Sequence, residues 1–396
     1  MRKKIIFMLI NMNIGGTEKA LLNMINEIPK DKYDITIFML EKYGGFLEFI
    51  PSNVNVKYFN GYQSIKDILN NPPQLMSLHL IKKGKIIKAI TIMILHVITK
   101  ILKNRSLFFR YTLNNYPVLE EEYDYALAYD GPMDFISYFI LKKIKAKKKF
   151  QWIHFDVTKI GFNPRFASKV YSQYDKVFVV SKEARTKLIE LVPNLQAKVD
   201  TFLNATSPQL IMSQAKEGLG FTDQFDGLRI LTVGRLSTEK GQDIAIQVLA
   251  RLIKNGYKVR WYCVGEGNAR GEYEKLIKKF NLGDTFILLG SNPNPYPFMD
   301  QCDIYVQPSR HEGYCITLME ARYLNKPIIT TSFTGAKEQI NHGENGLIVG
   351  SNEDEIYHSL VELINNNELR NKLSENLTKE KFERRLETDK IFDCVG

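Results

Sequence analysis

The stretch RILTVGRLSTEKGQDIAIQVLARLIK, residues 229–254, decides the fold class of this chain. It opens with a short apolar run that has the length of a buried strand, and it continues into a polar loop with two glycines. Its second half is a segment whose apolar residues recur at helical spacing. A strand that runs through such a loop into a helix is the unit of a parallel sheet covered by helices on both faces.

The same alternation extends in both directions from this stretch. We expect strands at residues 5–10, 35–40, 125–129, 177–180, 229–233, 259–264, 286–289, 304–307 and 327–331. We expect helices at residues 19–28, 182–191, 243–254, 273–280, 317–323 and 354–365. A chain of 396 residues also exceeds what one hydrophobic core usually fills. The sequence therefore predicts an α/β protein of two Rossmann-like domains, with a polar, glycine-containing linker within residues 203–228.

The composition is that of an ordinary globular protein. Hydrophobic residues make up 44% of the chain and charged residues 25%, whereas a disordered chain has far fewer apolar residues. The four cysteines lie far apart and form no Cys-x-x-Cys pair, so we expect neither a disulfide framework nor a zinc site. This cysteine usage is typical of a reducing compartment and predicts a cytoplasmic protein.

The N-terminus has some features of a signal peptide but lacks others. Three basic residues precede the apolar run at residues 5–10, which is too short for the core of a signal peptide. A glycine turn follows where a cleavage site of small residues would stand, so a first buried strand is the better interpretation. Because no apolar run reaches eighteen residues, we expect no transmembrane helix.

The net charge of +10 is unevenly distributed. Residues 68–119 contain no acidic residue but eight basic ones, which are Lys82, Lys83, Lys85, Lys88, Lys100, Lys103, Arg105 and Arg110. A second basic run covers residues 142–149. Basic blocks attract polyanions, but charge alone does not distinguish lipid headgroups from nucleic acid.

Residues 85–103 form an amphipathic segment inside the first basic region. Wound as a helix, one half of the segment is apolar and consists of Ile86, Ile87, Ile90, Ile94, Val97, Ile98 and Ile101. The other half carries Lys85, Lys88, Thr91, His96, Thr99, Lys100 and Lys103, interrupted by Ile92, Leu95 and Leu102. Two interpretations stay open: a helix packed into the N-terminal domain, or an interfacial helix with lysines on anionic lipid and its apolar half in the bilayer edge.

Gly15 and Gly16 follow the first expected strand and precede the first expected helix. Glycines let the backbone approach a ligand closely, and a helix N-terminus directs N–H groups at an anion. Most such pairs are only tight turns. The position at the carboxyl end of a strand, where doubly wound sheets bind ligands, favours a binding role here.

Arg235 and Lys240 lie five residues apart, between Gly234 and Gly241, directly after the strand at residues 229–233. An arginine fork can bind two oxygens of a diphosphate, and a lysine adds a point charge. The simpler alternative is a solvated basic loop. Two glycines and two cations at one strand–helix junction favour phosphate binding over that alternative.

Glu312 and Glu320 are separated by eight residues after the strand at residues 304–307. Glu312 falls in a loop and Glu320 inside the following helix, so the two carboxylates are not expected to face each other. Separate hydrogen bonds to the hydroxyl groups of one elongated ligand suit this placement. The alternative is that Glu312 caps the helix and Glu320 is a surface charge.

Together these motifs resemble the retaining glycosyltransferases of the GT-B superfamily, specifically family 4, which includes bacterial enzymes of capsular and surface polysaccharide synthesis. The matching positions follow the family's order and are Gly15, Gly16, Gly234, Arg235, Lys240, Gly241, Gly265, Glu266, Gly267, Glu312, Glu320 and the loop at residues 340–346. Residues 53–122 match no motif of the family. The resemblance implies two Rossmann-like domains facing across a cleft. Residues 1–206 would form the acceptor-side domain and residues 207–378 the nucleotide-sugar-binding domain, with a helix at 379–396 returning to the first domain.

The resemblance also implies a role for individual residues. The donor-binding positions would be Gly15, Gly16, Gly234, Arg235, Lys240, Gly265, Glu266, Glu312, Gly313, Tyr314, Cys315 and Glu320. Arg235 and Lys240 would hold the diphosphate of the donor. Glu320 would bind the ribose hydroxyls, Glu312 and the backbone of residues 313–315 would hold the sugar ring, and Gly265 and Glu266 would border the nucleoside.

The implied catalytic residues are His154, Glu312, Arg235 and Lys240. His154 matches the histidine that lies beside the sugar in family members, although an isolated histidine is usually structural. Asp156 is a weaker companion, since an aspartate at a strand end often caps a turn. Many members have phenylalanine followed by glycine or proline where this chain has Tyr314 and Cys315, which leaves the identity of the sugar open.

The implied function is that of a hexosyltransferase, which moves a sugar from a nucleotide diphosphate-sugar to a glycan or polyprenyl-linked acceptor. A UDP-sugar is the favoured donor. Cationic side chains would replace a metal ion, so no metal and no cofactor are expected. The alternatives are a UDP-sugar 2-epimerase of the same fold and a non-catalytic GT-B partner subunit. A nucleic-acid binder is disfavoured because the basic runs lack interleaved aromatic residues. The resemblance names neither the general base nor the acceptor linkage.

Overall fold

The structure is a computed structural model that describes residues 2–204 and 207–380. The chain divides into two compact units. The first consists of Met1–Asn13 and Ile28–Phe202, and the second of Ile14–Glu27 and Leu203–Gly396. The helix expected at residues 379–396 lies almost wholly outside the described residues, and the facing arrangement of the two domains stays a prediction.

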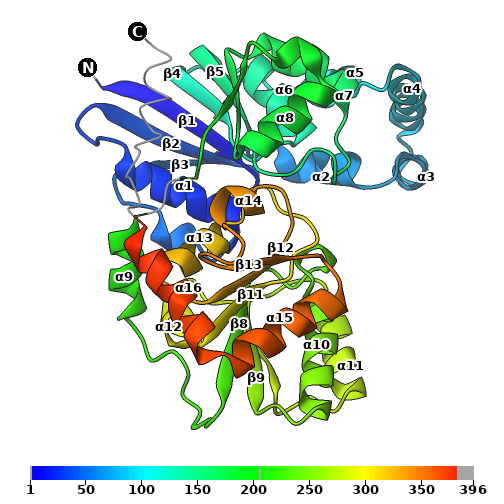
Figure 1. The fold of residues 1–396 in the computed structure, drawn as a ribbon. Helices are drawn as coiled ribbons and strands as arrows, with labels where there is room; N and C mark the ends of the chain where they lie inside the picture. Colours follow the sequence, from blue (N-terminus) through cyan, green and yellow to red (C-terminus); the bar gives the residue numbers. More distant parts are fainter. Residues whose placement is uncertain (1, 205–206, 381–396) are drawn as a thin grey trace. The chain divides into compact units, whose positions relative to one another are not determined.

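The first unit is built on a parallel sheet of seven strands in the order β3-β2-β1-β4-β5-β6-β7 (Figure 1). Its strands are β1 (Lys3–Leu9), β2 (Tyr33–Met39), β3 (Asn55–Tyr58), β4 (Glu122–Ala128), β5 (Lys145–Ile153), β6 (Lys176–Val179) and β7 (Val199–Thr201). Its helices are α2 (Tyr62–Asn70), α3 (Pro73–Lys82), α4 (Ile86–Leu102), α5 (Ser106–Thr112), α6 (Asp134–Lys143), α7 (Pro164–Val170) and α8 (Lys182–Leu191). Short 3-10 turns are η1 (Leu47–Phe49), η2 (Tyr171–Gln173) and η3 (Pro193–Leu195). The central strand β1 is buried over its last five residues, as expected for a parallel sheet covered on both faces.

The second unit contains a parallel sheet of six strands in the order β10-β9-β8-β11-β12-β13. Its strands are β8 (Leu228–Val233), β9 (Val259–Val264), β10 (Phe286–Gly290), β11 (Ile304–Gln307), β12 (Ile328–Thr331) and β13 (Leu347–Val349). Its helices are α1 (Gly16–Glu27), α9 (Pro208–Ala215), the 3-10 turn η4 (Thr238–Lys240), α10 (Gln242–Lys254), α11 (Arg270–Lys279), α12 (Tyr296–Gln301), α13 (Ile316–Tyr323), α14 (Ala336–Gln339), α15 (Glu353–Asn365) and α16 (Asn367–Lys379). Two Rossmann-like units with parallel sheets are therefore the fold class that the sequence predicts.

The structure contains elements that the sequence does not predict, among them the strands β3, β5, β7 and β13 and the helix α9, and two of these are informative. The expected linker contains the helix α9, which starts with Pro208 after a side-chain cap from Ser207 and packs against α12 and α13. The basic run at residues 142–149 leads into an unpredicted strand, β5. Lys149 in this strand places its Nζ among the carbonyl oxygens that end α6 and donates to Ile140, Leu141 and Ile144 at 2.6–3.0 Å. A lysine that satisfies helix-end carbonyls in this way stabilises the unit rather than binding a partner.

Each sheet reverses its strand order at one point. The strands at these two points, β1 and β8, are the strands that the predicted glycine motifs follow. In the first sheet β1 lies between β2 and β4, and in the second sheet β8 lies between β9 and β11. Connections that leave two such neighbouring strands in opposite directions open a crevice at their carboxyl ends, where open α/β sheets bind ligands. Among the described residues, no helix is both long enough and apolar enough to cross a membrane.

Candidate functional site

The loops after β8 and β11 meet at the strand reversal of the second sheet, because β8 and β11 are hydrogen-bonded neighbours. Gly241 shows how closely the two loops approach. Its φ is +73°, and a Cβ placed on it would lie 2.0 Å from the carbonyl oxygen of Pro308. Only glycine fits a left-handed position in such contact, so Gly241 is required for the two loops to lie together.

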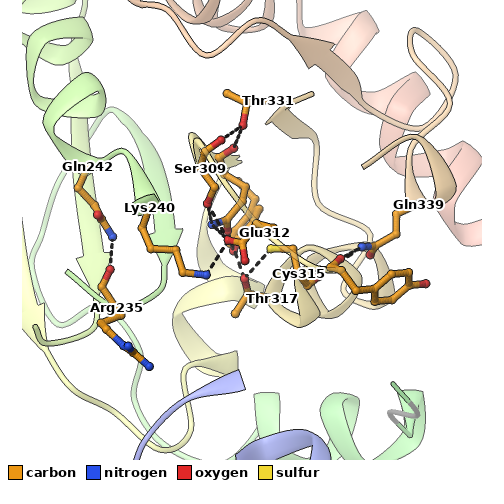
Figure 2. Close-up of polar contacts among 12 residues, drawn as sticks. Arg235, Lys240, Gln242, Ser309, Glu312, Cys315, Thr317, Thr331 and Gln339 are labelled. Carbon is orange, nitrogen blue, oxygen red and sulfur yellow. Dashed lines mark hydrogen bonds and ion pairs between the residues drawn. The ribbon is translucent and has the colours of Figure 1, made fainter. Parts of the chain in front are cut away.

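Lys240 and Glu312 form the centre of this site (Figure 2). The Nζ of Lys240 lies 2.6 Å from Oε1 of Glu312, which also accepts a hydrogen bond of 2.7 Å from the Ser309 hydroxyl. Burial disfavours the charge on Lys240, but the Glu312 carboxylate outweighs that effect and raises its pKa. The site therefore presents a fixed ammonium group and an oriented carboxylate at the carboxyl edge of the sheet.

Arg235 supplies a second positive charge on the same loop. Its side chain is exposed, and its backbone carbonyl accepts a 2.8 Å hydrogen bond from Nε2 of the buried Gln242 (Figure 2). The backbone of this loop is thus held in place while the guanidinium is available to solvent. An oriented lysine and an exposed arginine at one strand end can neutralise the charge of a diphosphate.

Helix α13 begins at Ile316, four residues after Glu312. Cys315, directly before the helix, has a φ of +59°, an unusual value for a residue with a side chain. Gln339 donates through Nε2 to the carbonyl oxygen of Tyr314 and so holds this turn (Figure 2). Burial raises the pKa of the Cys315 thiol to about 12, so this group is a neutral thiol at physiological pH and not a nucleophile.

Glu320 is fully buried, and its polar contacts are with residues other than Lys240 and Glu312. Its Oε1 accepts a 2.8 Å hydrogen bond from the Tyr296 hydroxyl and lies 3.2 Å from Nζ of Lys19. Its second carboxylate oxygen is buried and has no partner in the structure. A buried carboxylate with spare acceptor capacity is suited to bind hydroxyl groups of a ligand.

Gly15 and Gly16 lie beside these residues within the second unit, because the segment 14–27 belongs to it. A Cβ on Gly15 would lie 3.7 Å from Nη2 of Arg235, and one on Gly16 would lie 3.9 Å from Cδ1 of Ile316. The N-terminus of α1 therefore adds backbone N–H groups near Arg235 and near the start of α13. The sequence predicted a role for these glycines but not their grouping with the second unit.

Gly265 and Glu266 follow β9, which pairs with β8, so they lie at the same edge of the sheet as the loop that carries Arg235. Gly265 has a φ of +151°, and a Cβ on it would lie 2.0 Å from the carbonyl oxygen of Gly234. Glu266 is partly exposed and pairs with Arg270 at the start of α11. The structure thus joins the glycine motifs after β8 and β9, whereas the Glu266 side chain is engaged by a surface arginine.

His154 and Asp156 belong to the first unit and follow β5. The ring Nε2 of His154 lies 2.9 Å from the carbonyl oxygen of Tyr129, which follows the neighbouring strand β4. Burial lowers the pKa of His154 to about 3, so the ring is neutral, and an Nε2–H that donates to the carbonyl leaves Nδ1 as an acceptor. Asp156 accepts a hydrogen bond from the Thr158 backbone N–H at 2.8 Å and pairs with Lys187, which matches the capping alternative.

Several residues of the site are not recognisable in the sequence. Arg310 binds both carboxylate oxygens of Asp243 at 2.8 and 2.6 Å, and it also donates to the carbonyl of Thr238. This contact joins the loop that carries Glu312 to the turn that carries Lys240. Pairs such as Arg310 and Asp243 are far apart in sequence, so only the adjacency of β8 and β11 reveals them.

No group of three or more His, Cys, Asp or Glu side chains in the described part of the chain is arranged to hold a metal ion. Metal independence itself stays a prediction. The chemistry that the described residues do offer is charge neutralisation by Lys240 and Arg235, and hydrogen bonding by Glu312 and Glu320.

Two Rossmann-like units with these loops belong to the GT-B fold class, and the comparisons with known proteins agree. Residues 224–380 match the family model described as "Glycosyl transferases group 1". The matched region contains β8 to α16 and every second-unit site residue named above except those of the segment 14–27.

Curated relatives show the same similarity. A Campylobacter jejuni protein named N-acetylgalactosamine-N,N'-diacetylbacillosaminyl-diphospho-undecaprenol 4-alpha-N-acetylgalactosaminyltransferase is 31% identical over 202 residues, 50% of this chain and 53% of that protein. The chain thus spans about half the length of the first curated relatives that it matches. An uncharacterized glycosyltransferase of Haemophilus influenzae is 22% identical over 93% of this chain and 92% of its own length. The solved structure of HepE from Anabaena in complex with UDP and glucose superposes with a TM-score of 0.71 at 18% identity, covering 100% of this chain and 99% of that one.

Proposed function

We propose that this protein is a glycosyltransferase that moves a sugar from a nucleotide diphosphate-sugar, most favourably a UDP-sugar, to a glycan or lipid-linked acceptor. The observation that carries the proposal is the Lys240–Glu312 pair of 2.6 Å at the carboxyl ends of β8 and β11, with Arg235 on the same loop. It lies in the region that matches the group 1 glycosyl transferases. Support for UDP comes from HepE, whose solved complex contains UDP and glucose.

In the proposed reaction, the bond between the anomeric carbon and the diphosphate oxygen breaks while a bond to an acceptor oxygen forms. Negative charge develops on the departing diphosphate, and positive charge develops on the sugar ring. Arg235 and Lys240 stabilise the first charge, so no divalent metal is required. The acceptor hydroxyl attacks on the face that the diphosphate leaves and gives its proton to the departing diphosphate oxygen, so the configuration is retained, as the resemblance to family 4 implies.

The other site residues hold the donor. Glu320 binds the ribose hydroxyls through its buried carboxylate, which has an oxygen without a partner. When the donor binds, the ammonium group of Lys240, still paired with Glu312, faces the diphosphate, and Glu312 also accepts hydrogen bonds from the sugar hydroxyls. The backbone N–H groups at the starts of α1 and α13 add positive electrostatic potential at the phosphates. His154 is a neutral hydrogen-bonding group for the sugar.

We infer that the acceptor is carried by a lipid and that the reaction belongs to the synthesis of a capsular or other surface polysaccharide. The name of the Campylobacter relative describes a diphospho-undecaprenol acceptor, and a Staphylococcus aureus relative, 28% identical over 161 residues, is named for capsular polysaccharide biosynthesis. The protein then works on the cytoplasmic side, as a peripheral protein of the membrane. An anionic membrane surface suits the exposed lysines of residues 82–103, which form no ion pair within the described part of the chain.

The test is a panel of UDP-, GDP- and ADP-sugars incubated with the purified chain, in which released nucleotide is measured. The proposal predicts release of the nucleotide from UDP-sugars, increased by a polyprenyl-linked glycan acceptor. An epimerase would instead convert the sugar of the donor without consuming an acceptor. A donor that stays intact under all conditions would contradict the proposal.

A further inference from the structure

The helices α3 and α4 form a hairpin at the margin of the first unit, away from the strands of its sheet (Figure 1). The two helices pack together, and the Ser77 hydroxyl donates to the Ala89 carbonyl at 3.3 Å. Met76 and Leu80 of α3 and Ala89 and Ile92 of α4 are buried in the core of the unit. These residues fix the hairpin to the unit through one side only.

The opposite side of α4 is apolar and exposed. Ile87, Ile90, Ile94, Val97 and Ile101 are 83%, 53%, 53%, 51% and 71% exposed. Their spacing of three and four residues places them on a single stripe, roughly opposite the buried Ala89 and Ile92. The apolar half expected from the sequence is therefore correct, but the unit does not bury it. Ala89, Ile92 and Leu95 pack the helix onto the core of the unit, whereas Leu102 is 51% exposed.

The neighbouring helix α3 extends this apolar surface. Leu75, Leu78 and Ile81 recur every three residues and are 61%, 57% and 50% exposed. Soluble proteins rarely expose a contiguous group of large aliphatic side chains, and such a group marks an interaction surface. We name this surface, formed by the three residues of α3 and the five of the α4 stripe, the hairpin face.

Cations bracket the hairpin face at both of its ends. Lys82 ends α3, Lys83 and Lys85 lie in the turn before α4, and Lys100 and Lys103 lie at the other end of α4. Over the residues that the structure describes, none of these five forms an ion pair. Lys147 and Lys148 of the second basic run, in contrast, pair with Asp124 and Asp175. The hairpin cations are thus available to an external anion.

The chemistry of the hairpin face selects one kind of partner. A second copy of the chain would bring like charges together, because residues 68–119 contain no acid to oppose the lysines. A single-stranded nucleic acid is bound on aromatic platforms, whereas the hairpin face is aliphatic. Aliphatic side chains flanked by lysines suit an anionic bilayer, in which the apolar groups enter the acyl region and the ammonium groups stay among the headgroups.

We propose that the hairpin face of α3 and α4 docks the protein on an anionic lipid bilayer, with the α4 stripe inserted at the headgroup boundary. Docking itself does not depend on the proposed function. Together with the proposed function it explains how a lipid-linked acceptor is reached, because the first unit then lies on the surface that carries the acceptor.

The experiment compares co-sedimentation of the full chain with vesicles of phosphatidylglycerol and phosphatidylcholine and with vesicles of phosphatidylcholine alone. The stripe variant is Ile87→Gln, Ile94→Gln and Ile101→Gln, and its control is Leu219→Gln, Phe280→Gln and Leu289→Gln, which are exposed apolar residues of the second unit. The charge variant is Lys83→Gln, Lys85→Gln and Lys103→Gln, and its control is Lys275→Gln, Lys278→Gln and Lys279→Gln on α11.

Three lysines near a surface contribute roughly a hundredfold to partitioning at low salt, so the charge variant loses about that factor on anionic vesicles. Binding of the wild type weakens with salt but is not abolished, since the stripe supplies a salt-independent part. The stripe variant loses at least about tenfold at any salt concentration. Both controls bind as the wild type does, and nucleotide release without vesicles is the same in all five proteins.

Three results would overturn the proposal. Equal pelleting of the wild type and the stripe variant would show that the α4 stripe does not insert into the bilayer. Equal binding of the wild type to anionic and neutral vesicles would show that the lysines do not contribute to docking. A wild type that is dimeric by light scattering, and becomes monomeric in the stripe variant, would assign the hairpin face to a second copy. Because docking is measured without a donor, a failure of the proposed activity does not affect these outcomes.

Discussion

The Lys240–Glu312 pair determines what each of its two residues can do when the donor arrives. The ammonium group is held at the strand ends by the carboxylate, at 2.6 Å, instead of sampling many rotamers. Such preorganisation makes a charge effective in a transition state, because little reorganisation is left to the moment of reaction. Lys240→Ala removes the charge and also leaves a partly buried carboxylate without its main partner.

We therefore expect Arg235→Ala and Lys240→Ala each to lower donor turnover by roughly two or more orders of magnitude while the protein stays folded. The measurement is kcat/KM for a UDP-sugar, with circular dichroism for the fold. A matched control is Lys254→Ala, which removes a lysine at the far end of α10 in the same unit. Near-wild-type kcat/KM in either site variant would refute the assignment of the diphosphate site.

His154 leads to a prediction about pH. Its pKa in the folded protein is about 3, against about 6.5 in an unfolded chain, because burial disfavours the charged ring. Between these values the unfolded chain binds more protons, so the contribution of His154 to stability is complete above pH 6.5 and is lost as the pH falls toward 3. The wild type should lose about 2 kcal/mol of unfolding free energy through His154 between pH 7.5 and pH 5.

Urea unfolding at the two pH values measures this effect in the wild type and in His154→Gln. The variant lacks the titrating ring. Its loss of unfolding free energy between pH 7.5 and pH 5 should therefore be about 2 kcal/mol smaller than that of the wild type. Identical pH dependence in the two proteins would mean that His154 is charged, or titrates normally, in the folded state.

At the scale of elements, the turn 238–243 and the loop 308–312 act as one piece because Arg310 joins them. Arg310 binds Asp243 through two hydrogen bonds and Thr238 through a third. Lysine keeps the charge but loses the fork that grips both carboxylate oxygens. Arg310 is thus a positioning residue, which sets the separation of Lys240 and Glu312 without touching the ligand.

Arg310→Lys should weaken UDP binding about tenfold, the loss of about 1.4 kcal/mol, measured by titration calorimetry. The control is Arg251→Lys on α10, whose partner Asp354 is exposed at the surface of the same unit. Arg251→Lys should leave UDP binding unchanged, even if its effect on melting temperature equals that of Arg310→Lys. Equal UDP affinity in the two variants would show that Arg310 has only a structural effect.

The elements that could be predicted from the sequence are those with a strong local pattern. Strands β1 and β8 are continuous apolar runs, and α8 and α10 have clear helical periodicity, so their approximate limits follow from the residues. The sequence does not predict strand β5, because the lysines at its start have low strand propensity, which pairing with the neighbouring strands β4 and β6 overrides.

The candidate site was predictable as a set of motifs but not as a set of contacts. The glycines and cations after β8 and the two glutamates after β11 are recognisable from their spacing. Lys240 and Glu312 are 72 positions apart, and their pairing depends on the adjacency of β8 and β11. The Lys19–Glu320 contact also needs the three-dimensional structure, because it joins α1 to α13.

At the scale of the whole molecule, the use of cationic side chains in place of a metal makes a simple prediction. Transfer from a UDP-sugar should proceed at an unchanged rate in excess EDTA, because Arg235 and Lys240 neutralise the diphosphate. A loss of activity on chelation that manganese or magnesium restores would contradict metal-free catalysis. The control is the same assay with EDTA already saturated by calcium.

The central claim is that the second unit holds the diphosphate of a sugar donor during group transfer. The most direct measurement is UDP release from a UDP-sugar, with a polyprenyl-linked glycan acceptor, by the wild type and by Arg235→Ala/Lys240→Ala. A double variant of two cations in the last turn of α10 in the same unit, Arg251→Ala/Lys254→Ala, is the control. We predict release coupled to glycosylated acceptor in the wild type and the control, and loss of both in the site variant. Equal release by the site variant and the wild type would contradict the account.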